Sequence, residues 1–418
     1  MLNQIRLFIL VFFISIISAN GTPNLIGIGS LKSMQTVQVI EYSIMPNFRY
    51  GVSLYNPATW HNLKFTQLSM KYNGIKNSGS VMNIGSGLSK SILIIPFKKN
   101  SAIGFSLEPY SDQNISLRDS LTEAIFIFED TLNLERDYIR EGGLISLQTG
   151  YGYKLNDKIS GGANLSFVFG STRASEQLKI DQVSTIEKHR YNYSGVLFQG
   201  FTNFYFSPNL AVFLSIKMPV KSLETIYQRY HLFEDLNGNG FHDNFGDFPS
   251  PIDISAPKKE YLDEVIHSPS EIIIGLDRKL FNRTRFHSQF SKYSDKGVIQ
   301  NTYNKVANKM IKSSTNLSLG LIRFSNDLST SFYDRFIFKM GFDYKNSIIT
   351  PKIPIREFGY GLGISFKFKS LNNQIDFSYS GGFRSYDDNY KSESFQQLQV
   401  GLTIADLWFV KRRQRRNE

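Results

Sequence analysis

The sequence predicts an all-β fold, a 14-stranded antiparallel transmembrane β-barrel with an N-terminal hatch, or plug, inside its lumen. Three observations lead to this prediction: a long stretch of alternating apolar and small residues, fourteen segments of strand character, and links between them that are alternately short and long. Because strands of such a barrel expose only half of their residues to lipid, the mean hydropathy of −0.23 is compatible with a membrane protein.

The stretch Phe358–Lys369 shows the alternation most clearly. Aromatic and branched aliphatic side chains occupy its even positions, from Phe358 to Phe368, whereas glycine, serine and lysine occupy the odd positions. Successive side chains of a strand point to opposite faces, so one face of this strand is apolar and the other is small or polar. The length suits the roughly 9–11 residues with which a tilted strand crosses a bilayer. After a turn at 370–374, the alternation resumes at Ile375.

Fourteen candidate strands follow one another along the chain. They lie near residues 62–72, 80–96, 101–112, 142–154, 158–171, 191–206, 209–219, 269–279, 284–294, 313–324, 333–345, 356–369, 373–385 and 395–409. This pattern predicts a single barrel over residues 61–410.

The links between these strands indicate how the barrel is oriented. Short turns such as Phe97–Asn100 and Leu155–Asp157 alternate with links that are mostly long, and the long ones span 113–141, 172–190, 220–268 and 295–312. Short turns at one end and long extracellular loops at the other are typical of outer-membrane barrels. An even number of strands also places both termini at the short-turn, periplasmic end, including a basic tail at 411–418.

Residues 1–21 have the form of a secretory signal peptide. Arg6 supplies a positive charge, residues 7–17 are almost wholly apolar, and Ser18 to Gly21 are small or polar residues suited to cleavage. The apolar segment is too short for a membrane helix, which needs about 20 residues. The sequence therefore predicts export and a location in the bacterial outer membrane.

The composition argues against two kinds of site. Cysteine is absent, which excludes disulfides and thiolate metal sites. The net charge of +11 is scattered over loops and inward strand positions, with one dense cluster at Lys411–Arg416. Since an exported protein does not meet nucleic acid, we expect no such partner. The expected partners are outer-membrane lipids and the machinery that inserts barrels.

Residues 22–60 precede the first strand and do not alternate. They end in Tyr55-Asn56-Pro57-Ala58, followed by Thr59-Trp60. With the fourteen strands that follow, this arrangement resembles the FadL-like family of outer-membrane transporters for long-chain fatty acids and other hydrophobic compounds. The resemblance implies that residues 22–60 fold into the barrel as a hatch and that Asn56, Pro57 and Ala58 match the family's Asn-Pro-Ala signature.

The segment also departs from that family. Arg49-Tyr-Gly-Val-Ser-Leu54 replaces the glycine- and acid-rich residues that usually precede the signature. Taken from the residues alone, Asn-Pro-Ala predicts a turn or extended break followed by a small residue, and the alternative is an ordinary loop before the first strand.

The resemblance further implies a sideways exit for cargo, because the family's third strand is kinked and opens the wall to lipid. The corresponding residue is Pro109, which cannot donate to the hydrogen-bond ladder. From the residues alone, Pro109 fits equally well as the end of that strand at the outer rim.

The resemblance predicts passive uptake of a small hydrophobic, fatty-acid-like ligand through the plugged barrel. The alternative is a docking or secretion component for exported proteins, as in PorV-like relatives of this barrel. Uptake predicts an apolar path through the lumen, whereas docking predicts a polar lumen.

The long link 220–268 contains a candidate metal site. Positions 1, 3, 5, 7 and 9 of a calcium-binding loop are matched by Asp235, Asn237, Asn239, Phe241 and Asp243. Position 12 is Gly246 rather than Glu, so Asp247 is the candidate for the remaining carboxylate. A structural calcium ion and an ordinary surface loop rich in glycine and asparagine both fit this sequence, and no other cofactor is expected.

No enzyme activity is predicted. The six histidines show no metal-binding spacing. His287 and Ser288 form the only pair that resembles a catalytic motif, that of outer-membrane phospholipases. Adjacent strand residues point to opposite sides of the wall, so they cannot act together as base and nucleophile.

Overall fold

The structure is a computed structural model, and it is described for most of the chain. The described residues are 28–31, 40, 42–48, 51–78, 83–97, 100–118, 123–127, 130–180, 183–243, 246–250, 258–260, 264–281, 283–297, 311–326, 331–349, 353–368, 373–386 and 392–406. The predicted signal peptide, the basic tail and most of the link 295–312 lie outside these residues. Within them, no helix is long and apolar enough to span a membrane.

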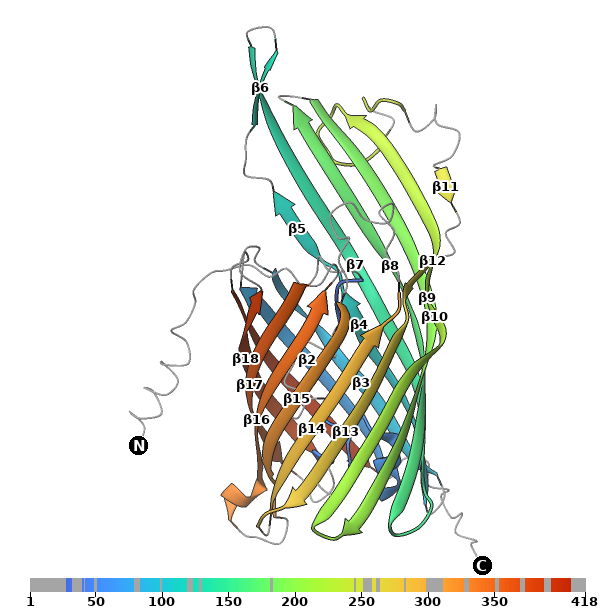
Figure 1. The fold of residues 1–418 in the computed structure, drawn as a ribbon, viewed down its shortest axis with the longest axis vertical. Helices are drawn as coiled ribbons and strands as arrows, with labels where there is room; N and C mark the ends of the chain where they lie inside the picture. The colour runs from blue at the N-terminus through green and yellow to red at the C-terminus, as the bar shows by residue number, and fades with distance from the viewer. Residues whose placement is uncertain are drawn as a thin grey trace, which may run out of the picture.

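Fourteen antiparallel strands form a closed barrel, as predicted (Figure 1). They are β2 (Thr66–Ser78), β3 (Asn83–Phe97), β4 (Ser101–Asp112), β7 (Asp130–Lys154), β8 (Ile159–Ile180), β9 (Val183–Ser207), β10 (Leu210–Asp235), β13 (Pro269–Lys279), β14 (Thr284–Asp295), β15 (Ile311–Arg323), β16 (Phe336–Ile349), β17 (Ile353–Lys367), β18 (Gln374–Tyr386) and β19 (Glu393–Asp406). The barrel closes where β19 pairs with β2, for example Leu402 opposite Met70.

Alternation along each strand separates a lipid face from a lumenal face. On β16, Phe338 and Phe342 are 43% and 45% exposed, whereas Ile337, Lys339 and Asp343 at the alternate positions are buried. Other strands repeat this pattern, and the buried inward positions are mostly serine, asparagine, glutamine and charged residues. The lumen wall is therefore polar, while the outer face is suited to lipid.

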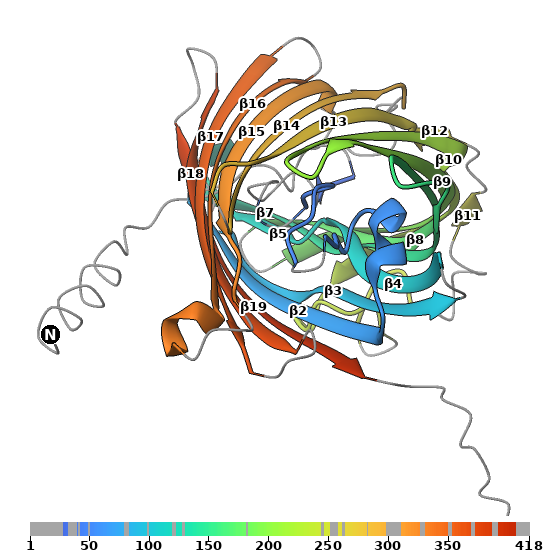
Figure 2. The ribbon, with the colours of Figure 1, turned by 90° about the horizontal axis from the view of Figure 1, so that it is seen from below.

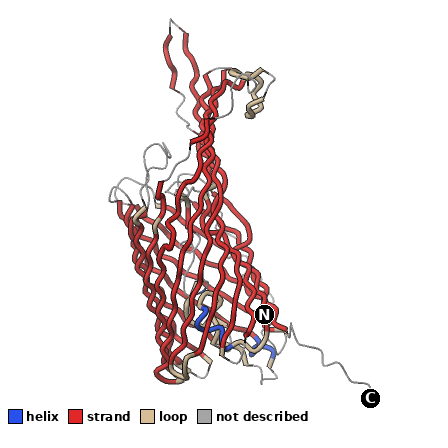
Figure 3. Tube along the Cα trace, turned by 90° about the vertical axis from the view of Figure 1, so that its right-hand side faces the viewer, coloured by secondary structure: helices blue, strands red, loops and turns tan. Residues whose placement is uncertain are grey.

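Four strands continue far beyond the rim at the long-link end. β7 to β10 have 25, 22, 25 and 26 residues, and β10 pairs with β13 only as far as Lys217 opposite Glu271. Their outer parts form a tall sheet, here called the extension, which Figures 1 and 3 show above the barrel. Short strands flank it: β5 (Ile115–Arg118) and β6 (Glu123–Ile127) on β7, and β11 (Lys258–Glu260) and β12 (Glu264–His267) on β10.

Three of the links predicted to be long loops contain much strand, because they form the extension. The link 172–190 is almost wholly a β8–β9 hairpin, and much of 113–141 and 220–268 is also strand. Outside the membrane no lipid requires one apolar face, so a strand there does not alternate. The hairpin pairs Arg173 with Arg190 and Glu176 with Glu187, a pattern that the sequence does not distinguish from a polar loop.

The base of the extension is irregular. Along β10, the register with β9 shifts three times between Pro219 and Tyr227. On β7, Gly142 has a φ of +117°, which L side chains rarely adopt, and a Cβ there would overlap the backbone of Ser171. Bulges bend and twist a strand locally, so this row of irregularities sets the extension apart from the barrel wall.

The described residues of the N-terminal segment lie inside the lumen, where a hatch is expected (Figure 2). At the extracellular side, β1 (Ser30–Leu31) pairs with the end of β4. At the periplasmic side, the segment ends in the 3₁₀ helix η3 (Pro57–Asn62), seen within the ring of strands in Figure 2. Trp60 and its hatch neighbours pack on the wall residues Ile92, Ile94 and Ala102. A second 3₁₀ helix, η4 (Phe332–Arg335), precedes β16.

Candidate functional site: the hatch and the lumenal pocket

Asn56 forms hydrogen bonds both within the hatch and between the hatch and the barrel wall. Its side chain is fully buried, and its Oδ1 accepts a 3.0 Å hydrogen bond from the Ala58 amide, which caps η3. Its Nδ2 donates to the Ile44 carbonyl and to Asn203 Oδ1 on β9, both at 2.8 Å. Pro57 follows at the first turn of the helix, where its missing N–H costs nothing. The role of Asn56, Pro57 and Ala58 as a functional signature stays a prediction.

The hatch contacts the barrel wall at positions occupied by glycine. A Cβ on Gly152 or Gly162 would overlap Pro57, and on Gly162 it would also overlap the Ala58 amide. Trp60 lies over two further glycines, Gly104 and Gly150. Its indole Nε1 donates a 2.9 Å hydrogen bond to the Ser53 carbonyl. Only glycine permits backbone and indole to approach the wall this closely. The sequence shows these glycines but gives no signal that the hatch occupies the space beside them.

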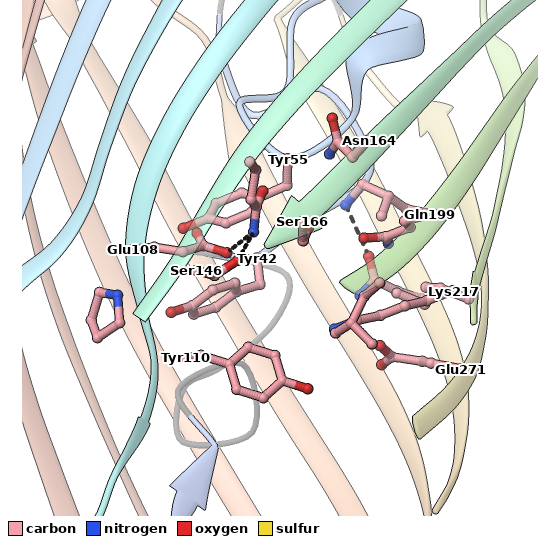
Figure 4. Close-up of a pocket in the computed structure, with 16 residues that line it drawn as sticks. Tyr42, Tyr55, Glu108, Tyr110, Ser146, Asn164, Ser166, Gln199, Lys217 and Glu271 are labelled. Atoms are coloured by element: carbon pink, nitrogen blue, oxygen red, sulfur yellow. Dashed lines mark hydrogen bonds between the residues drawn. The ribbon is translucent and has the colours of Figure 1, made fainter. Parts of the chain in front are cut away.

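A cavity of about 90 Å³ lies above the hatch in the lumen (Figure 4). Tyr42, Ile44 and Tyr55 of the hatch line one side of it. The wall contributes apolar and polar groups: Tyr110, Leu197 and Ile273, together with Glu108, Ser146, Gln148, Ser166, Gln199, Lys217 and Glu271. A dry cavity of about 150 Å³ is known to hold benzene, so this one must expand to admit a ligand of that size.

An ion pair borders this cavity. Lys90 Nζ lies 3.0 Å from Glu108 Oε2, and the lysine side chain is 2% exposed. The same Nζ sits 3.6 Å from the centroid of the Tyr55 ring, so the cation also contacts the hatch. Gln148 donates to the other carboxylate oxygen at 2.5 Å. Hatch, β3, β4 and β7 thus meet at one buried charge pair.

The ladder between β3 and β4 ends beside that ion pair. Its pairs run from Phe97–Ser101 to Ser91–Leu107, and among the described residues none joins 83–90 of β3 to 108–112 of β4. In place of β3, the hatch strand β1 pairs with Ser111 and Asp112. Here the Lys90–Glu108 ion pair and the short β1–β4 pairing take the place of a β3–β4 backbone ladder.

The irregularity expected at Pro109 is present. The β4–β7 register shifts between Pro109 and Ser111, and Pro109 itself lines the cavity. The strand continues to Asp112, so Pro109 does not end it. Its role as a lateral gate stays a prediction.

Residues 56–58 of the hatch do not pack near Pro109. Pro57 lies against Gly152, whose partner on β4 is Ala102. Seven residues separate Ala102 from Pro109, or about 23 Å along a strand at about 3.3 Å per residue. Tyr42 and Tyr55 are the hatch residues that share the cavity with Pro109. The hatch spans the lumen, so its signature and its cavity-lining residues lie at different depths.

A second cavity lies at the periplasmic end. It measures about 600 Å³, and Pro46, Phe48, Gly51 and Asn62 of the hatch line it together with wall residues that include Asp277 and Arg285. Ile44 faces the upper cavity, while Met45 is fully buried and packs against Gly275. Residues 44–48 of the hatch therefore partition the lumen.

One polar cluster at the rim was not predicted. His267 of β12 lies between Tyr110 of β4, whose hydroxyl is 2.6 Å from Nε2, and Asp295 of β14, whose Oδ2 is 2.5 Å from Nδ1. Three strands far apart in the sequence supply these groups, so no local spacing reveals them. The prediction for His287 and Ser288 agrees with the structure, since His287 is fully buried and the next residue alternates to the other face.

Comparison with known proteins fits this architecture. Residues 1–414 match the model of a protein family described as BamG. No curated protein sequence matches the chain. A Pseudomonas aeruginosa FadL homologue is 14% identical with a TM-score of 0.57, covering 88% of this chain and 97% of that one. The CymD monoaromatic hydrocarbon channel is 12% identical with a TM-score of 0.56, covering 93% and 100%.

The Pseudomonas putida toluene transporter TodX is 12% identical, with a TM-score of 0.50 over 94% of this chain and 99% of that one. Identities this low establish a common fold and nothing finer. These structural neighbours are channels and transporters rather than enzymes, and the barrel fold places the protein in the outer membrane. Since the family model covers almost the entire sequence, the chain belongs to the BamG family and has the FadL-like barrel fold.

Proposed function

We propose that the barrel mediates passive uptake of small hydrophobic molecules, with the cavity above the hatch as the binding pocket and the β3–β4 wall as the exit. The observation that supports this most directly is the coincidence of the two features. Glu108, Pro109 and Tyr110 line the cavity, and they lie where the β3–β4 ladder has ended. The names of the structural neighbours, which include hydrocarbon channels and a toluene transporter, support the same class of cargo.

The cavity lining refines the kind of ligand. Tyr42, Tyr55 and Tyr110 provide aromatic faces, and Ile44 and Leu197 provide aliphatic surface. Glutamine, lysine and glutamate side chains among them provide hydrogen-bonding groups. An apolar molecule with one polar end, such as a fatty acid or an aromatic acid or alcohol, matches this mixture better than a pure hydrocarbon does.

A lateral exit follows from the energetics of such a ligand. Transfer into lipid releases about 0.8 kcal/mol per buried CH₂, whereas release into the periplasm exposes the same surface to water. The route downward also meets the partition at residues 44–48. Opening the side wall requires movement of the Lys90–Glu108 pair and of β1, without removal of any β3–β4 ladder bond beyond Leu107.

Filling the cavity tests this assignment. Replacement of Ser166, which lines the cavity, by Trp should reduce uptake of labelled fatty acid or aromatic acid at least tenfold, because the indole occupies most of the space. The measurement compares cells that lack the native gene and carry either variant or wild type. Ser288→Trp, at the neighbouring alternation position to the buried His287, is the matched control and should transport normally. Normal uptake by Ser166→Trp would contradict the proposal. So would a wild-type protein that does not raise uptake above the level of cells without the gene.

Docking of exported proteins is a second candidate, favoured by the polar lumen and by the extension of β7–β10. None of the structural neighbours named above is a secretion component. This candidate predicts that cells without the protein lose particular surface proteins and that a variant blocked in uptake restores them. Surface proteins that remain unchanged in the deletion strain would exclude docking.

A further inference from the structure

The loop that follows β10 is closed into a ring at the outer tip of the extension, where Figure 3 shows loop in tan. Glu234 and Phe248 join its two ends, with N–O distances of 2.7 and 3.2 Å. The ring contains Asp235, Asn237, Asn239, Phe241, Asp243 and Asp247. Lys188 of β9 donates to the Gly240 carbonyl and so ties the ring to the sheet.

Internal hydrogen bonds hold the oxygen-bearing side chains in place. Asp235 Oδ2 accepts the Gly240 amide at 2.8 Å, and Asp247 Oδ2 accepts the Asp243 amide at 2.7 Å. Asn237 and Asn239 each accept the amide two residues later, at 2.9 and 2.7 Å. Gly238 and Gly240 have φ near +70° and +75°, which bends the chain around these groups.

Two buried carboxylate oxygens have no hydrogen-bond donor among the described residues. Asp235 and Asp247 are 2% and 6% exposed, and the Oδ1 atom of each accepts no hydrogen bond from that part of the chain. A buried charged oxygen without a donor raises the free energy of the folded state, and it marks a place where a cation would be stabilising. The unused oxygens belong to the first and last carboxylates of the ring, which the hydrogen bonds through Oδ2 hold toward its interior.

The charge balance calls for more than Lys188. Three carboxylates, those of Asp235, Asp243 and Asp247, occupy one small ring. Lys188 supplies one ammonium beside the ring, and a divalent cation would supply further positive charge to the buried Oδ1 atoms of Asp235 and Asp247.

We propose that the ring binds one Ca²⁺ ion, with Asp235 Oδ1 and Asp247 Oδ1 as its carboxylate anchors. Asp243 completes the acidic ligands, and the side-chain oxygens of Asn237 and Asn239 and the Phe241 carbonyl are the neutral ones. An amide oxygen that accepts one N–H keeps a second lone pair for the ion. Oxygen-only ligands from a flexible loop suit calcium better than zinc or magnesium.

The proposed ligand set is not a cluster of acidic side chains alone. Among the described residues, no group of three or more His, Cys, Asp or Glu side chains is placed to hold a metal ion by itself. The carboxylates of the ring therefore depend on the amide and backbone oxygens to complete the site. Gly246 at position 12 has a φ of +96° and places Asp247, one residue later, in the role that a glutamate fills in a standard loop.

Calcium binding to the full-length protein in detergent tests the proposal. Isothermal titration should show one Ca²⁺ per chain in the wild type and affinity at least tenfold weaker in Asp235→Asn and Asp247→Asn. Asp157→Asn changes an exposed aspartate at the periplasmic turn and should bind like wild type. Heat-modifiable migration on gels verifies that each barrel is folded. Equal affinity in all four proteins, no binding by the wild type, or equally tight Mg²⁺ binding would overturn the assignment.

Proteolysis adds a structural measurement. Leu236 and Phe241 are 57% and 71% exposed, so chymotrypsin has cleavage sites in the ring. Chelator should speed cleavage there in wild type, and it should have no effect in Asp247→Asn. Lys188→Met should bind Ca²⁺ more tightly because a competing charge is removed. If Lys188→Met is instead cleaved rapidly in saturating Ca²⁺, the lysine is the native counterion and the proposal fails.

Discussion

Cysteines in place of Lys90 and Glu108 are expected to abolish uptake when oxidised and to restore it when reduced. The two side chains meet at 3.0 Å just beyond the last β3–β4 ladder pair, Ser91–Leu107. A disulfide needs Cα atoms about 4.4–6.8 Å apart, and Lys90 and Glu108 are the immediate chain neighbours of the paired residues Ser91 and Leu107. The chain has no native cysteine, so the bond is unique. It would replace a separable ion pair by a covalent staple across the proposed exit.

The control staples strands that are already joined by a ladder. Ser69 and Thr403 face each other across the β2–β19 seam, with their hydroxyl oxygens 2.9 Å apart. A disulfide between cysteines at these positions should leave uptake unchanged in either redox state. The reduced Lys90→Cys/Glu108→Cys protein also shows the effect of losing the charges alone. Equal uptake by its oxidised and reduced forms, with the disulfide confirmed by mass, would exclude this exit.

Replacement of Asn56 by Leu is expected to turn the plugged barrel into a leaky one. The substitution removes the donor to Ile44 and Asn203 and the cap of the Ala58 amide. Each buried group left without a partner costs about 1–3 kcal/mol, which is large against the weak forces that hold a short hatch. Single-channel conductance in planar bilayers should rise from near zero to frequent open events, and cells should become sensitive to large hydrophilic antibiotics.

Asn56→Asp separates the two functions of this side chain. A carboxylate keeps the acceptor for the Ala58 amide but loses both donations, and it would face the Ile44 and Asn203 oxygens. We therefore expect it to leak almost as much as Asn56→Leu. If the Asn56→Asp barrel remained sealed while the Asn56→Leu barrel leaked, the cap rather than the anchor to the wall would hold the hatch. Sealed channels in both variants would show that Asn56 does not retain the hatch.

The sequence predicted the barrel because lipid imposes a readable pattern. The two faces of β16 and β17 meet different surroundings, lipid on one side and the polar lumen on the other. Apolar and polar residues therefore alternate along them, and the predicted limits of these strands agree with the observed limits to within a few residues. Beyond the rim no lipid covers the outer face of β8 and β9, so residues 172–190 carry no such pattern and resemble a loop. The strand number was therefore predictable, and the height of the extension was not.

The site was predictable only where a local motif exists. Pro109 and the ring beginning at Asp235 can be recognised from a few consecutive residues. The first is a proline, which lacks the backbone N–H, and the second is a regular spacing of residues with oxygen ligands. Lys90, Tyr55 and Tyr110 come together only when three separate segments pack, and a single sequence does not record that packing. The hatch itself was inferred from resemblance, while its glycine contacts at 104, 150, 152 and 162 required coordinates.

The irregular base of the extension makes it mechanically separate from the barrel. A regular four-stranded sheet would act as a stiff lever, and a load at its tip would twist the wall strands that carry Gly152 and Asn203. The shifts between Pro219 and Tyr227, together with Gly142, instead place a compliant joint at the membrane surface. A load at the tip is therefore expected to bend the extension at this row of irregularities before it displaces the strands around the hatch.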